Sequence, residues 1–123
     1  MTEEFIATEN GNIKIAEEVI VRISAISARE VEGVASLGAG ASIGDFLGKK
    51  TPAKGIKVET EDDKTIIDVH VTVKFGVKIN EVAAHIQEAV KTAVESYAGI
   101  ENTVVNVFVD AIENAAAEDT QKE

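Results

Sequence analysis

The chain has 123 residues, which fits one domain of ordinary size. Its hydrophobic and charged fractions, 45% and 28%, lie in the range of globular proteins and exclude disorder throughout the chain. It has no cysteine, which excludes disulfide bonds, a cysteine-ligated metal centre and a thiol nucleophile.

The net charge of −10 argues against nucleic acid as a ligand, because an acidic surface repels phosphate groups. No apolar run reaches the ~18 residues that a membrane-spanning helix needs. The first ten residues are acidic and lack the basic and apolar regions of a secretory signal. The sequence therefore predicts a cytoplasmic protein that does not itself insert into a membrane.

The two ends differ in composition from the body of the chain. Residues 1–10 are acidic and residues 113–123 are polar and acidic, and neither segment has enough apolar residues to build a core. We expect both to be tails around a single domain that covers residues 11–112.

The first half of that domain begins with a short extended segment, residues 11–15, followed by an amphipathic helix over residues 16–31. The expected inner stripe of this helix is Val19, Ile20, Ile23, Ile26 and Ser27. Val21 falls outside that stripe. A short strand is predicted over residues 34–37, and residues 38–54 form an irregular, glycine-rich loop.

Strict alternation of apolar and polar residues predicts two strands, residues 56–61 and 65–75. Asp62, Asp63 and Lys64 form the turn between them, so the pair is a β-hairpin.

The second helix is expected over residues 81–98, with Asn80 as its N-cap and Gly99 as its C-terminal stop. Its expected inner face is Val82, Ile86, Val90, Ala93, Val94 and Tyr97. A last strand covers residues 105–111.

These elements predict an α/β (α+β) fold, a two-layer sandwich in the order β(short)-α-β-β-β-α-β. Two helices pack on one face of a mixed sheet of about four strands. The other face is expected to be open and to carry Lys57, Glu59, Asp68, His70, Thr72, Lys74, Asn106 and Phe108.

Two glycine-rich stretches resemble phosphate-binding loops, but neither has the required spacing. In residues 38–44 the last glycine comes one position late for a dinucleotide fingerprint. In residues 44–51 three residues separate the glycines where a P-loop has four. We expect no nucleotide cofactor.

The remaining candidates for catalysis or metal binding also have simpler explanations. His70 and His85 are the only histidines, and they lack the partner ligands that a zinc site needs. His85 and Glu88 are three residues apart on a predicted helix, a spacing that is more typical of a surface pair than of two metal ligands. Asp62 and Asp63 suit a turn better than a catalytic pair. No serine lies in a nucleophile elbow. The sequence predicts no catalytic residues, no metal and no cofactor, so the protein is not expected to be an enzyme.

One segment of the glycine-rich loop suits partner binding. Three large apolar residues are followed by two lysines: Ile43, Phe46, Leu47, Lys49 and Lys50. The apolar side chains either pack beneath the loop as a small cluster or form an exposed apolar and basic patch for a protein partner.

Several segments in fixed order resemble the alkaline shock protein family, the envelope stress response proteins of Gram-positive bacteria, also described as general-stress proteins. They are GNIKIAEEVI (11–20), AREVEGV (28–34), KGIKVE (54–59), FGVKINEVA (75–83), Ile86-Gln87 and VNVFV (105–109). Phe75 departs from the tyrosine common at this position in the family. The resemblance implies a non-enzymatic cytoplasmic protein of envelope homeostasis that self-assembles and is recruited to the inner face of the membrane by a small membrane-anchored protein.

The leading hypothesis is therefore a structural or adaptor protein of the envelope stress response, a homo-oligomer that docks on a membrane-anchored partner. The alternative is a module that binds a small molecule or nucleic acid on the open sheet face. That face offers only one aromatic residue, Phe108, which favours the first hypothesis.

Overall fold

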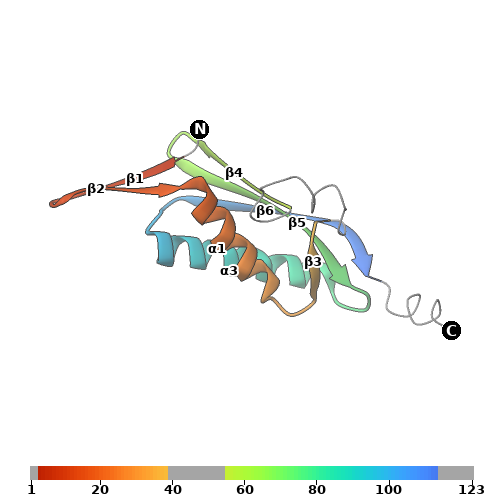
Figure 1. Cartoon of the computed structure of the whole chain (residues 1–123). Coiled ribbons are helices and arrows are strands. Elements are labelled where there is room, and N and C mark those ends of the chain that lie inside the picture. The colour runs from red at the N-terminus through yellow and green to blue at the C-terminus, as the bar shows by residue number, and fades with distance from the viewer. Residues whose placement is uncertain (1–2, 39–54, 114–123) are drawn as a thin grey trace.

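The computed structural model describes residues 3–38 and 55–113, and the side chains from residue 7 onward within those ranges (Figure 1). The elements in chain order are β1 (Glu3–Thr8), β2 (Gly11–Ala16), α1 (Glu17–Arg29), β3 (Val34–Leu37), β4 (Ile56–Glu61), β5 (Lys64–Lys74), α3 (Ile79–Ala98) and β6 (Thr103–Glu113). They confirm the predicted fold class: both helices of the described residues pack on one side of a four-stranded mixed sheet.

Strand β5 is the centre of this sheet. β6 runs parallel to it along one edge, from Thr65 opposite Thr103 to Lys74 opposite Glu113. On the other edge, β4 pairs with its first half and β3 with its second half, both antiparallel. β3 and β4 therefore share one edge of β5, end to end.

The predicted β4–β5 hairpin is confirmed, but Lys64, expected in the turn, is the first residue of β5. Glu61 pairs with Lys64, which leaves Asp62 and Asp63 as a two-residue turn. Both aspartates have positive φ, 49° and 68°, as a turn that follows the right-handed twist of the strands requires. Asp tolerates this conformation better than most residues, so the turn explains both carboxylates.

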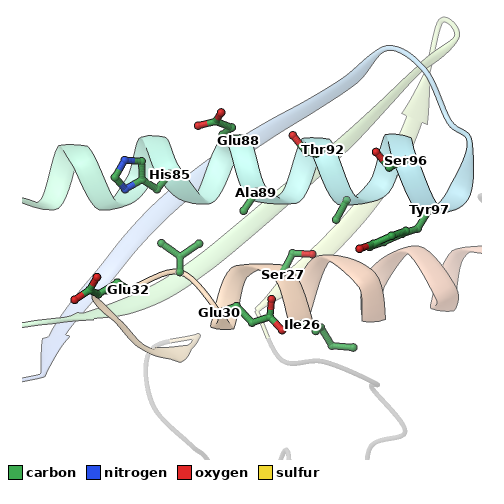
Figure 2. Close-up of a pocket in the computed structure, with 12 residues that line it drawn as sticks. Ile26, Ser27, Glu30, Glu32, His85, Glu88, Ala89, Thr92, Ser96 and Tyr97 are labelled. Carbon is green, nitrogen blue, oxygen red and sulfur yellow. The ribbon is translucent and has the colours of Figure 1, made fainter.

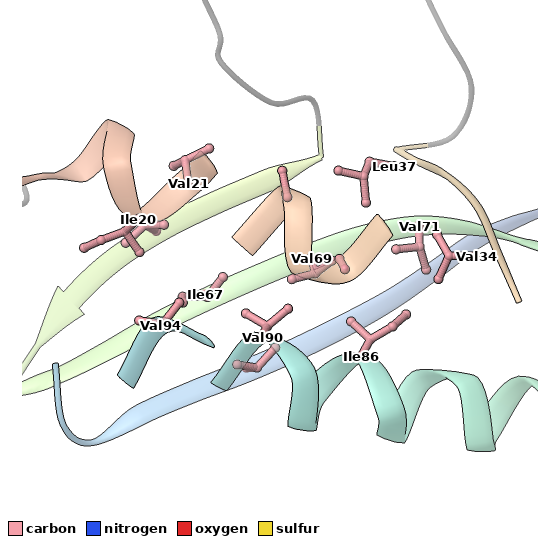
Figure 3. Packing of buried hydrophobic residues seen from close by; sticks show 14 of the residues in the cluster. Ile20, Val21, Val34, Leu37, Ile67, Val69, Val71, Ile86, Val90 and Val94 are labelled. Atoms are coloured by element: carbon pink, nitrogen blue, oxygen red, sulfur yellow. The ribbon is translucent and has the colours of Figure 1, made fainter. Parts of the chain in front are cut away.

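The core lies between the sheet and the helix layer (Figure 3). Alternate side chains of β5 face it: Ile67, Val69, Val71 and Val73 are all fully buried. From α3 come Val82, Ile86, Val90, Ala93, Val94 and Ala98. The alternating pattern of β5 thus holds one sheet face in the core and leaves the other free of helices, as predicted.

Helix α1 buries a face that only partly overlaps the predicted one: Ile20 is buried and Ile23 packs against the core as expected, but Val19 and Ile26 do not. Its buried residues are Ile20, Val21, Ser24, Ala25 and Ala28. Val19 and Ile26 are about half exposed, 47% and 52%. Small side chains let α1 lie close to the sheet. The buried Ser24 hydroxyl has a hydrogen-bond partner within its own helix, because it donates to the Ile20 carbonyl 2.8 Å away.

The ends of α3 confirm one prediction and correct another. Gly99 ends the helix in the left-handed conformation, at φ 71°, and its N–H donates to the Glu95 carbonyl. The N-cap is Lys78 rather than Asn80, with no side-chain hydrogen bond at the cap. Asn80 lies inside the first turn, because the helix begins two residues earlier than its apolar stripe suggests.

Residues 3–8 form a strand, where the sequence analysis expects the acidic N-terminal tail. β1 pairs with β2 from Glu3 opposite Ala16 to Thr8 opposite Gly11. The turn is held by Thr8, whose hydroxyl donates to the Gly11 carbonyl at 2.8 Å and accepts from the Asn10 N–H at 3.1 Å. In Figure 1 this hairpin projects from the body of the domain.

Deleting residues 1–10 should change the melting temperature by less than about 5 °C. The side chains that the structure describes in this segment, Ala7 to Asn10, are exposed, and so are those of residues 11–14, so these described side chains bury little apolar surface. Thermal unfolding followed by circular dichroism, at one protein concentration, measures the change. A much larger drop would show that β1 packs on the body.

Candidate functional site

A groove of about 710 Å³ runs along the helix layer between α1 and α3 (Figure 2). One wall comes from the end of α1 and the residues after it: Ile26, Ser27, Glu30, Val31 and Glu32. The other wall comes from α3: His85, Glu88, Ala89, Thr92, Ala93, Ser96 and Tyr97.

The groove is open because the facing side chains of the two helices are small. Ala89 and Ala93 line the α3 wall, and Ser27 faces them from α1. The Ser27 hydroxyl donates back to the Ile23 carbonyl, 2.8 Å away, within its own helix. It therefore does not bridge the two walls.

Two large apolar side chains at the groove are exposed to solvent. Ile26 is 52% exposed and Tyr97 is 79% exposed. Figure 2 shows the Tyr97 ring pointing from α3 toward α1. The sequence pattern assigns both residues to buried faces, and both assignments are wrong. Large apolar side chains that gather beside a groove are typical of a binding surface.

The charge of the groove is acidic. Its lining, among the residues that the structure describes, contains three carboxylates, Glu30, Glu32 and Glu88, with His85 as the one titratable nitrogen and no lysine or arginine. A smaller hollow of about 330 Å³ adjoins the groove at Glu32 and His85, which line both. Lysines as well as glutamates line this hollow.

The nearby cation on α3 is engaged elsewhere. Lys91 Nζ lies 2.8 Å from Glu95 Oε2 and 3.2 Å from the carbonyl oxygen of Thr103, at the start of β6. The hydrogen bond from Lys91, with a second from the Thr103 N–H, lowers the pKa of Glu95. Lys91 therefore serves the contact between α3 and β6 and is not in the groove lining.

The open face of the sheet carries polar groups that pair with one another. His70 Nδ1 lies 2.7 Å from Asp110 Oδ2, and the His70 ring stacks on Phe108 with centroids 4.6 Å apart. Asn106 donates to Asp68 at 3.0 Å. These groups satisfy one another, so the face offers few free groups for a small-molecule ligand.

The loop residues predicted to bind a partner, Ile43, Phe46, Leu47, Lys49 and Lys50, lie outside the described residues. The two histidines lie apart in the fold, His70 on the open sheet face and His85 at the groove. Within residues 3–38 and 55–113, no three His, Asp or Glu side chains come together as a metal site would require.

Sequence reasoning missed the groove because it chose the bulkier of two stripes on α1 as the inner one. The signal was Val21 together with the small residues Ser24, Ala25 and Ala28, which share one side of the helix at spacings of three and four. Placing that stripe inward leaves Ile26 near the groove.

Neither helix in the described part of the chain is long and apolar enough to cross a membrane.

Comparison with known proteins identifies relatives along most of the chain. An uncharacterized protein of Streptococcus pyogenes, Spy1614, is 37% identical over 87% of this chain and 92% of its own length. The uncharacterized protein YqhY of Bacillus subtilis is 36% identical over 86% of this chain and 80% of its own length. A solved structure of a MamM CTD variant aligns at TM-score 0.48 with 18% identity, covering 80% of this chain and all of that one.

The model of one family, described as having a cell envelope-related function, matches residues 6–114. This match and the two relatives confirm the resemblance found in the sequence. The chain belongs to the alkaline shock protein 23 family.

Proposed function

We propose that this protein is a non-enzymatic structural or adaptor protein of the envelope stress response, which self-associates and docks on a membrane-anchored partner. The observation that carries the proposal is the groove between α1 and α3, where Ile26 and Tyr97 are exposed beside small side chains. A surface of this kind buries apolar area when a protein segment covers it, and that burial drives association.

Self-association is supported by the β1–β2 hairpin. A two-stranded hairpin is at best marginally stable in water on its own, and this one projects from the body with Ile13 49% exposed. Packing against a second copy would stabilise it. Many weak contacts in an assembly then strengthen binding to the partner through avidity.

An anchored protein is a better membrane receptor for this chain than lipid. The chain carries a net charge of −10, which opposes binding to anionic headgroups. Lys49 and Lys50 could contribute only about 1 kcal/mol each toward an anionic surface. The segment from Ile43 to Lys50 is proposed as a second contact with the anchor protein, at the inner face of the membrane.

The test compares purified protein with cells. Purified protein should not sediment with vesicles that contain about 30% anionic phospholipid. In its own cells, a fraction should sediment with the membranes, and protease treatment of stripped membranes should abolish rebinding of fresh protein. Direct binding to the vesicles, or no membrane fraction in cells under any envelope stress, would contradict the proposal.

A further inference from the structure

We propose that the α1–α3 groove binds a basic amphipathic helix of the anchor protein, one that places apolar side chains in the groove and lysines or arginines against its glutamates. This inference rests on the proposed function and names the docking site and the chemistry of its ligand.

The groove walls offer space and apolar surface to the ligand. Ala89 and Ala93 on α3 leave space for large side chains of a ligand, and exposed Tyr97 offers a rigid aromatic face at one end. The α3 wall runs from His85 to Tyr97, about 18 Å of helix, which matches three turns of a docked helix. Helices that lie in such grooves present apolar anchors at spacings of three and four residues.

The charge of the groove selects among ligands. Among the described residues, Glu30, Glu32 and Glu88 line it and no lysine or arginine does, so a basic helix gains electrostatic attraction and an acidic one is repelled. A second copy of this chain is a poor occupant of the groove, because neither of its described helices carries more basic than acidic residues. Anionic lipid is disfavoured because its headgroups are negatively charged.

A membrane-anchored protein carries the required sequence next to its span. Segments on the cytoplasmic side of a membrane-spanning helix are enriched in lysine and arginine. A helix that continues from the span as an amphipathic segment would therefore be basic where this protein would meet it.

The binding test uses the full chain and a fluorescent peptide of about 18 residues, made of leucine and lysine in a helical amphipathic pattern. A matched peptide has glutamate in place of every lysine. Fluorescence anisotropy should show binding of the lysine peptide only, weakening as salt rises from about 50 to about 300 mM.

Charge reversal locates the site. Glu30→Lys with Glu88→Lys should weaken binding by about tenfold or more. Glu59→Lys with Glu61→Lys is the control, since it changes the net charge equally at exposed residues of β4 outside the groove. This control should bind within about twofold of the parent. All four glutamates are exposed, and circular dichroism checks that both variants fold.

Several results would overturn the proposal. Equal weakening by both variant pairs would show that the peptide responds only to net charge, and binding of the glutamate peptide would contradict the charge argument. A changed oligomeric state of the groove variant alone, with unchanged peptide affinity, would make the groove an interface between copies.

In cells, the groove variant should leave the membrane fraction while the β4 variant stays. If the parent protein is in the membrane fraction and the groove variant remains there too, the groove proposal fails and the adaptor function stands. If the parent itself is never in that fraction, the adaptor function fails independently.

Discussion

Replacing Ile86 by alanine should lower the free energy of unfolding by about 2–4 kcal/mol. Ile86 is fully buried on α3, in the cluster that includes Val71 of β5 and Val34 of β3 (Figure 3). The substitution removes apolar surface from the core and leaves a cavity that the packed helices and strands can only partly fill. Urea unfolding followed by circular dichroism, at one protein concentration, gives the change.

His70→Ala is the control on the opposite face of the sheet. His70 lies between two fully buried residues of β5 in sequence, but its side chain is 40% exposed and contacts Asp110 and Phe108. Losing a partly exposed hydrogen bond and a ring contact should cost less than about 1.5 kcal/mol. Equal costs at Ile86 and His70 would contradict the two-layer arrangement.

The strands were predictable because their signals are local. The alternation along β5 specifies which side chains enter the core, and the β4–β5 turn needs only Asp62 and Asp63, two residues that accept positive φ. β3 was also predicted within its observed bounds, Val34–Leu37. Such features depend on neighbours in sequence and in the paired strand.

The orientation of α1 was not predictable in the same way, because apolar residues surround the helix on most sides. The predicted stripe holds Ile20 together with Val19, Ile23 and Ile26, and the buried face holds Ile20 together with Val21 and the small residues. Which stripe is buried depends on how closely the helix approaches the sheet, and that is a tertiary property. The small-residue stripe is buried, and Ile26 is left at the groove.

β1 was missed for a related reason. Its apolar residues, Phe5, Ile6 and Ala7, follow one another directly, so the segment lacks the alternation of apolar and polar residues that signals a strand. It is held by pairing with β2 and by the Thr8 hydrogen bonds at the turn. A strand stabilised by backbone pairing leaves little trace in composition.

The same fold supports the proposal that a partner binds on the helix layer, although Phe108 on the open sheet face is also 42% exposed. The open face satisfies its polar groups in pairs, as His70 does with Asp110 and Asn106 does with Asp68. At the helix layer, Ile26 and Tyr97 remain exposed beside carboxylates. The feature of the helix layer that suits a protein partner is its exposed apolar area, rather than a set of reactive groups.

Gly55→Ala should destabilise the protein by about 2–5 kcal/mol, through backbone strain and a steric clash together. Gly55 has φ +85°, and a Cβ there would lie 2.8 Å from the backbone nitrogen of Gly38 and 2.8 Å from the carbonyl oxygen of His70. Those two atoms form a hydrogen bond of 2.6 Å, and the His70 N–H donates to the Gly55 carbonyl at 2.8 Å. The close approach holds β3 and β4 end to end against β5.

Gly76→Ala separates the strain from the clash. Gly76 has φ +100°, but a Cβ there would meet no atom within 4 Å, so only the backbone cost of about 1–2 kcal/mol should remain. Urea unfolding of both variants gives the difference, and faster hydrogen exchange at the Gly38 amide should mark Gly55→Ala alone. Equal destabilisation, with Gly38 exchange unchanged, would mean that the junction tolerates a side chain. A larger effect at Gly55 would show that the close contact among Gly38, Gly55 and His70 stabilises the junction of β3 and β4 against β5.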